Sequence, residues 1–256
     1  MNLRQNSSLE RTKDGAVKKL GIIGGASWSS TALYYEHINR AVAARQGGLH
    51  SARLLIESLD FADYAAFHAS EDWDSANAMI VTSAESLQRA GVDGLLLASN
   101  TMHKAAGAVA AATRLPIVDI RAATADRLAA DGRTHVALLG TRFTMTEPFA
   151  REKLDEQGIV VHHIAPEWQA EVNRIIYDEL ALGRVVRDSQ RKLKTLITEL
   201  AKQKVQAIVL ACTELVMAVD VRANVLPVYD TTAIHARAAV DWMLDDEQES
   251  QARAAA

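Results

Sequence analysis

Two short polar stretches in this chain carry side chains that can exchange protons with a ligand. Residues 99–101 (SNT) follow the apolar run GLLLA, and residues 212–214 (CTE) follow the apolar run AIVLA. Cys212 is the only cysteine, and a thiol at a helix N-terminus has a pKa below its usual value of about 8.5. The two stretches are therefore candidates for acid and base chemistry.

Each candidate also has a plainer explanation. A cysteine after an apolar run is often only a small buried hydrophobe, although Thr213 and Glu214 beside it favour a cleft or a helix cap. His103 suits either a site role or a solvent-facing position at a helix start. The stretch GIIGGASW lacks the full G-x-G-x-x-G spacing, so a dinucleotide site is not predicted.

Composition narrows the class of protein. The chain has 256 residues, of which 49% are hydrophobic, enough for one large domain or two small ones. Its net charge of −4 is spread along the chain, which gives no sign of a nucleic-acid or membrane partner. A single cysteine excludes an intrachain disulfide and a zinc site built on several cysteines. Because no run reaches the roughly 20 apolar residues that cross a bilayer, we expect a cytoplasmic protein.

Short apolar runs alternate with longer stretches of helical periodicity. We expect helices that include residues 30–43, 74–90, 123–130 and 188–202. The runs expected to form strands are 20–25, 52–59, 94–99, 115–120, 135–141, 159–166, 206–213 and 225–230. This alternation predicts an α/β fold with parallel sheets covered by helices on both faces.

The chain also contains an internal repeat. The pair LGIIGGASW and LLLASNTMH recurs as VALLGTRFTM and IVLACTELV at nearly the same separation. We therefore expect two similar α/β units, the first formed by residues 17–118 with 226–247, the second by 119–225. The polar ends, 1–16 and 248–256, are expected to be disordered tails.

Ligands of open α/β sheets bind beyond the carboxyl ends of the strands. Polar residues follow four of the expected strands, at positions 25–27, 99–101, 141–144 and 212–214. If the two units face each other, Ser99 and Cys212 approach one ligand from opposite sides. That arrangement suits a proton-transfer enzyme.

Seven blocks in order give the chain a resemblance to a known family. They are GIIGGASWSSTALYYEHIN, GGLHSARLLIESLDF, LLLASNTMHK, LLGTRFTM, VNRIIYDELALG, IVLACTEL and LPVYDTTAIHA. Together they resemble the aspartate/glutamate racemase family. The resemblance implies two Rossmann-like domains with pseudo-twofold symmetry and an active site between them. It also implies an amino acid as substrate, no pyridoxal phosphate, no metal, and a possible homodimer.

The resemblance implies a role for each strand end. Racemisation needs one group to remove the α-proton and another to deliver a proton to the opposite face. Members with two cysteines place one thiol in each domain, but only Cys212 matches here, and Ser99 stands at the other position. Some members carry threonine there. We expect an asymmetric enzyme in which Ser99, backed by water or His103, serves its face poorly.

The resemblance further implies which residues bind substrate. The hydroxyl and amide groups expected to contact the α-carboxylate and α-amine belong to Ser27, Asn100, Thr101, Thr141, Thr144 and Thr213. Glu214 would orient the groups near Cys212. Arg53 and Arg142 are possible partners for an anion.

Two glutamates bear on the substrate's side chain. Glu171 stands where members with acidic substrates tend to have lysine, and Glu57 adds another carboxylate. Both would repel aspartate, unless Glu171 simply pairs with Arg174 on a helix surface. The substrate therefore stays open between acidic amino acids and a broader or basic set. A decarboxylase of substituted malonates that uses a single cysteine, and a non-catalytic amino-acid-binding protein, are the alternatives.

Overall fold

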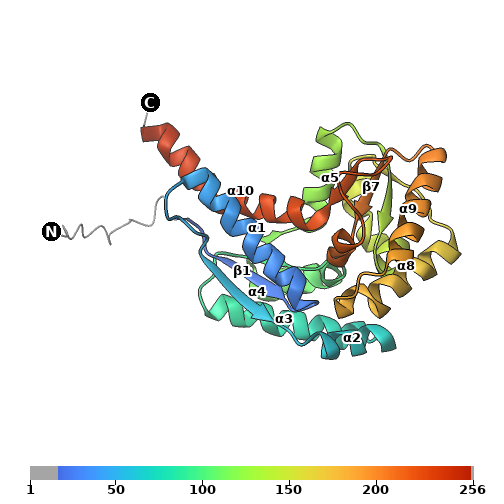
Figure 1. Cartoon of the computed structure of the whole chain (residues 1–256). Helices are drawn as coiled ribbons and strands as arrows, with labels where there is room; N and C mark the ends of the chain where they lie inside the picture. The colour runs from blue at the N-terminus through green and yellow to red at the C-terminus, as the bar shows by residue number, and fades with distance from the viewer. Residues whose placement is uncertain (1–16, 255–256) are drawn as a thin grey trace, which may run out of the picture.

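The computed structural model describes residues 17–254, which form two lobes, each built on a parallel sheet of four strands (Figure 1). The first sheet has the order β2-β1-β3-β4 and the second the order β6-β5-β7-β8. The second order repeats the first with every strand number raised by four. The predicted α/β class and the repeated unit are both confirmed.

The first sheet follows the expected apolar runs. Its strands are β1 (Leu20–Gly24), β2 (Leu54–Ser58), β3 (Gly94–Leu97) and β4 (Ile117–Val118). The central strands β1 and β3 are buried along their whole length, whereas β2 at the edge is partly exposed. Continuous apolar runs are what strands covered on both faces require.

Helices cover both faces of this sheet. They are α1 (Trp28–Gln46), α2 (Phe61–Ser70), α3 (Trp73–Arg89), the 3₁₀ helix η1 (Thr101–Ala105) and α4 (Ala106–Thr113). One apolar cluster joins α1 to one face, and a second joins α3 and α4 to the other. The side chains of Ser27, Asp60 and Asp72 cap the first three helices, each accepting a hydrogen bond from a backbone N–H of the first turn.

The second sheet comprises β5 (His135–Leu139), β6 (Val160–Val161), β7 (Ala207–Leu210) and β8 (Val228–Asp230). Its helices are α5 (Ile120–Ala130), α6 (Arg142–Thr146), η2 (Pro148–Ala150), α7 (Glu152–Glu156), α8 (Pro166–Asp178), η3 (Leu180–Leu182), α9 (Arg187–Lys202) and η4 (Thr213–Met217). The last helix of the chain is α10 (Thr231–Ala254). The helices expected around residues 30–43, 74–90, 123–130 and 188–202 correspond to α1, α3, α5 and α9.

The end of the chain differs from the expectation. We expected residues 226–247 to return to the first unit, but β8 pairs with β7 of the second sheet, with Leu210 opposite Asp230. Only α10 returns: it packs along α1 (Figure 1), and Arg45 there forms an ion pair with Asp241. The chain therefore crosses between lobes at the start of α10.

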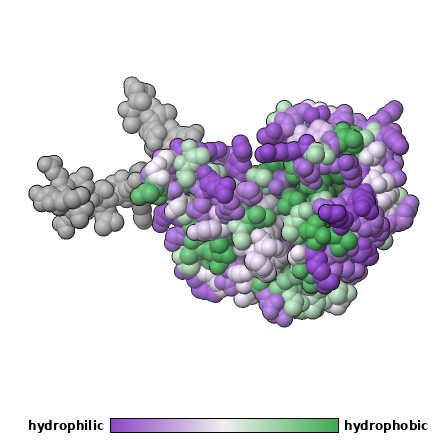
Figure 2. All heavy atoms as spheres, in the orientation of Figure 1, coloured by the Kyte–Doolittle hydropathy of each residue, from purple (hydrophilic) through white to green (hydrophobic). Residues whose placement is uncertain are grey.

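The expected tails also need a correction. Residues 248–254 continue α10, so that part of the predicted tail is helical. Residues 1–16 and 255–256 lie outside the described residues. No helix in the described part of the chain is long and apolar enough to cross a membrane. Figure 2 shows polar residues over much of one face, and a hydrophobic patch where that face is hollowed between the lobes.

Candidate active site

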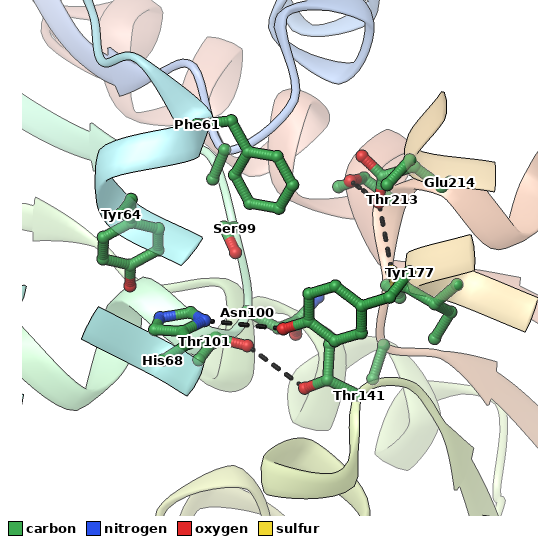
Figure 3. A pocket seen from close by; sticks show the side chains of 15 residues that line it. Phe61, Tyr64, His68, Ser99, Asn100, Thr101, Thr141, Tyr177, Thr213 and Glu214 are labelled. Carbon is green, nitrogen blue, oxygen red and sulfur yellow. Dashed lines mark hydrogen bonds between the residues drawn. The ribbon is translucent and has the colours of Figure 1, made fainter. Parts of the chain in front are cut away.

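A cavity lies between the lobes, at the carboxyl ends of the central strands (Figure 3). Its volume is about 40 Å³, far below the roughly 300–1,000 Å³ of pockets for drug-sized ligands. The lining residues are Ala26, Phe61, Tyr64, His68, Ser99, Asn100, Thr101, Thr141, Ile176, Tyr177, Ala181, Ala211, Cys212, Thr213 and Glu214. Both polar stretches singled out from the sequence, 99–101 and 212–214, therefore meet in one small site.

Two glycines let the backbone form the edges of this site. Gly25 has a φ of 89°, and a Cβ there would lie 2.1 Å from the carbonyl oxygen of Leu59. A Cβ on Gly140 would lie 2.8 Å from the carbonyl oxygen of Ala211, the residue before Cys212. A side chain at either position would push apart the strand ends that carry the cavity.

Cys212 is held in its protonated form. Its side chain is 9% exposed, and its thiol donates a hydrogen bond of 3.1 Å to Oε2 of Glu214. Burial raises the pKa of the Cys212 thiol, and the negative charge of Glu214 raises it further. The sequence predicted a lowered pKa from the adjacent helix start, and that prediction was wrong. The backbone N–H groups of Glu214 and Leu215 do lower the pKa of the thiol, but burial and the Glu214 charge raise it by more.

Glu214 is a buried carboxylate with one oxygen engaged and one open. The hydroxyl of Thr213 donates to Oε2 at 2.8 Å, beside the thiol. Oε1 has no hydrogen-bond partner among the described residues, although the residue is only 6% exposed and lines the cavity. A buried acceptor of this kind is costly to leave unpaired, so the site is ready for a donor.

Ser99 lines the cavity, but His103 does not support its hydroxyl. Nδ1 of His103 donates to the backbone oxygen of Ser99 at 2.9 Å, and Nε2 accepts from the N–H of Ile120 at 3.2 Å. Burial lowers the pKa of His103. The ring is therefore neutral with both nitrogens occupied, and it fixes the Ser99 backbone rather than backing the side chain as a base.

Most of the expected hydroxyl and amide groups gather at the cavity. The hydroxyls of Thr101 and Thr141, one from each lobe, lie 3.4 Å apart (Figure 3). The hydroxyl of Thr144, which does not line the cavity, lies 3.2 Å from that of Thr141. The amide of Asn100 donates to Thr231 at 3.1 Å. Ser27 does not line the cavity; it caps α1, with its side chain accepting from the N–H of Ser30.

The charged residues expected near the substrate lie elsewhere. Arg53 precedes β2, at the amino end of the sheet, where its guanidinium donates to the backbone oxygen of Val17. Glu171 accepts two hydrogen bonds from Arg174 and one from Lys192 on the surface of α8 and α9, and these cations lower its pKa to about 2. The surface-pair explanation for Glu171 is therefore the one that the structure supports.

Two other charged residues are also outside the cavity. Glu57 is exposed on the edge strand β2. Arg142 pairs with Glu71 at 2.5 Å, which joins α6 to the end of α2. Within residues 17–254, no three His, Cys, Asp or Glu side chains are grouped as metal ligands.

Sequence reasoning missed the aromatic wall of the cavity. Phe61, Tyr64 and His68 come from α2, and Tyr177 from α8 faces them, with its hydroxyl 3.5 Å from Nδ1 of His68 (Figure 3). Burial, with a smaller effect of the Lys104 charge, lowers the pKa of His68 to about 4. Residues 61, 64 and 68 have the spacing of one helix face, which is the signal that could have found them.

Comparisons with known proteins agree with this architecture. A protein of Yersinia pestis, provisionally described as an Asp/Glu racemase, is 42% identical, with a TM-score of 0.82 over 89% of this chain and 99% of that one. An aspartate racemase homologue from Pyrococcus horikoshii is 30% identical, with a TM-score of 0.74 over 88% and 99%. The broad-specificity amino-acid racemase RacX of Bacillus subtilis is 27% identical over 68% of this chain and 74% of its own.

The family assignment covers most of the chain. Residues 23–239 match the Asp/Glu/hydantoin racemase family. This range includes the second sheet, all of the first sheet except the start of β1, the aromatic wall and every residue that lines the cavity. The chain thus belongs to the Asp/Glu/hydantoin racemase family of isomerases.

Proposed function

We propose that the protein is a cofactor-independent amino-acid racemase with one strong acid–base group, Cys212, and a weak one, Ser99. The observation that carries the proposal is that both side chains line one cavity, from the ends of β7 and β3 in different lobes. A substrate Cα held between them would have one group on each face. The family membership and the relatives described as amino-acid racemases support the same chemistry.

Cys212 would act as follows. Its thiol proton moves to Oε2 of Glu214, 3.1 Å away, and the thiolate then removes the α-proton of the substrate. The carbanion takes a proton on its other face from a water held by the Ser99 hydroxyl, and the proton on Glu214 then passes through solvent to the hydroxide left there. A substrate ammonium beside Oε1 of Glu214 would offset the negative charge that keeps the thiol protonated.

Removal of the α-proton from the other enantiomer would be slower. The water or hydroxyl at Ser99 would have to remove the α-proton, and a serine hydroxyl ionises far too weakly to be an equal base. Cys212, already a thiol, would then deliver its proton to the carbanion. Two unequal groups therefore predict two unequal rates of α-proton exchange, one for each enantiomer.

The test is to measure α-proton exchange in deuterium oxide by proton NMR, with the L and D forms of each amino acid in separate samples. Cys212→Ala should lower exchange by at least about 100-fold, the usual size of a lost acid–base group. Exchange at the wild-type rate in Cys212→Ala would remove the thiol from the mechanism. Circular dichroism would confirm that the variant is folded.

A single protonated thiol at a small cavity also suits a decarboxylase of substituted malonates, in which Cys212 would protonate the carbanion left after loss of carbon dioxide. Release of carbon dioxide from such a malonate, without exchange of any amino acid, would favour that candidate. Binding of amino acids with neither reaction would favour a non-catalytic protein.

A further inference from the structure

We infer that the cavity selects amino acids with an uncharged side chain and rejects aspartate and glutamate. The inference rests on the proposed function and narrows its substrate class. The observations behind it are the charges that line the cavity and the engagement of the cations nearest to it.

No cation of the described chain lines the cavity. Of its fifteen lining residues none is lysine or arginine, and the only carboxylate is Glu214. A side-chain carboxylate of the substrate would therefore enter a site that already holds one negative charge. Burying a carboxylate without a charged partner is strongly unfavourable.

The two cations whose charges act on the aromatic wall, Lys104 on His68 and Arg142 on Tyr177, are already paired. Nζ of Lys104 lies 2.5 Å from Glu147 and 3.3 Å from the centre of the Trp73 ring. Arg142 pairs with Glu71 and stacks over the Phe143 ring, with its Cζ 4.2 Å from the ring centre. Each would have to leave a carboxylate to reach a substrate anion, so neither offers a free partner.

The two charges that every amino acid carries match the polar groups of the cavity. The open oxygen of Glu214, Oε1, suits the α-ammonium. The α-carboxylate suits the neutral side-chain donors Asn100 and Thr101. With both backbone charges so placed, the cavity has no further charged group for a side chain.

What remains for the side chain is the aromatic wall of Phe61, Tyr64, His68 and Tyr177. His68 is neutral, because its pKa is about 4, and its Nε2 is buried without a hydrogen-bond partner among the described residues. A neutral amide or hydroxyl can pair with that nitrogen. A cationic side chain would compete with the α-ammonium for the single open oxygen of Glu214, so the uncharged class fits best.

The sharpest experiment compares substrates that match in size and differ in charge. Asparagine and aspartate form one pair, and glutamine and glutamate the other. For wild-type protein we expect kcat/KM for α-proton exchange to be about 100-fold higher for the neutral member of the preferred pair. Equal or faster exchange from aspartate and glutamate, or fastest exchange from lysine, would overturn the inference while leaving the racemase intact.

If the protein is not a racemase, the result would be different, because no amino acid would exchange its α-proton. Selectivity could still be measured as binding, by saturation-transfer NMR with the same pairs. Tighter binding of asparagine and glutamine would uphold the inference, and tighter binding of their acidic counterparts would refute it.

A variant tests the role of the carboxylate. Glu214→Gln keeps the size of the side chain and removes its charge. The ratio of kcat/KM for the neutral substrate to kcat/KM for the acidic one should therefore fall by at least about tenfold. Glu171→Gln is the matched control, because Glu171 pairs with Arg174 outside the cavity, and its ratio should equal that of wild type. An unchanged ratio in Glu214→Gln would show that this carboxylate does not select.

Discussion

At the scale of single residues, the site depends on how a carboxylate and a thiol share one environment. The Glu214 charge favours the protonated form of Cys212, and the same carboxylate is the nearest acceptor for its proton. The Cys212 thiol is therefore an acid in the free protein, and it becomes a base when a positively charged group of a ligand offsets the charge of Glu214. A cysteine at a helix start would ordinarily be more acidic.

This balance predicts how Cys212 responds to pH. Because its pKa is raised, alkylation by iodoacetamide should be slow at neutral pH and should accelerate only above the range of an ordinary thiol. Glu214→Gln removes the negative charge, so its alkylation profile should shift to lower pH. As the chain has a single cysteine, all alkylation reports on Cys212. Coincident profiles for the two proteins would contradict the account of the thiol.

Sequence reasoning succeeded for residues whose position follows from the strand they end. Ser99 and Cys212 meet because parallel strands place their carboxyl ends on one edge. The same rule places Arg53 away from the site, because it precedes β2 and so lies at the amino ends of the strands. The environment of His103 could not be predicted, since both its hydrogen bonds depend on how η1 packs against the start of α5.

At the scale of elements, α10 fastens the chain that leaves the second sheet to the first lobe. Nε2 of His235 on this helix donates to the backbone oxygen of Val118 in β4 at 2.7 Å, and its Nδ1 accepts from the hydroxyl of Tyr34 in α1 at 2.9 Å. The sequence predicted that residues 226–247 return to the first unit but could not show that β8 stays in the second sheet. A strand of three residues is too short for its sequence to indicate which strand it pairs with.

The buried histidine predicts how stability depends on pH. Burial lowers the pKa of His235 to about 3, with a further effect of His103 nearby. The unfolded chain therefore binds a proton below about pH 6.5 that the folded chain does not, and the free energy of unfolding should fall as pH drops from 6.5. The contribution of one such group is up to about 1.4 kcal/mol per pH unit.

The matched variant is His235→Gln, which keeps a donor and an acceptor but cannot titrate. Urea unfolding at several pH values between 6.5 and 4 should show a smaller loss of stability on acidification in the variant than in the wild type. Parallel losses in the two proteins would show that His235 takes up its proton without unfolding.

At the scale of the whole molecule, each lobe supplies one half of the site. Thr101 and Thr141 meet across the lobes, and the pairs Arg142 with Glu71 and Lys104 with Glu147 join the lobes around the cavity. A homodimer and a cytoplasmic location stay predictions. Sedimentation would test the first.

The most direct test of the central claim is the ratio of initial α-proton exchange rates from the L and D forms of one substrate, with chiral analysis of the same samples. Wild-type protein should exchange one enantiomer at least about tenfold faster, and Ser99→Cys should bring the two rates together by supplying a second thiol. Ser70→Cys, on the exposed end of α2, is the control and should leave the ratio unchanged. Equal rates in the wild type, or a ratio that Ser99→Cys does not move, would contradict the account.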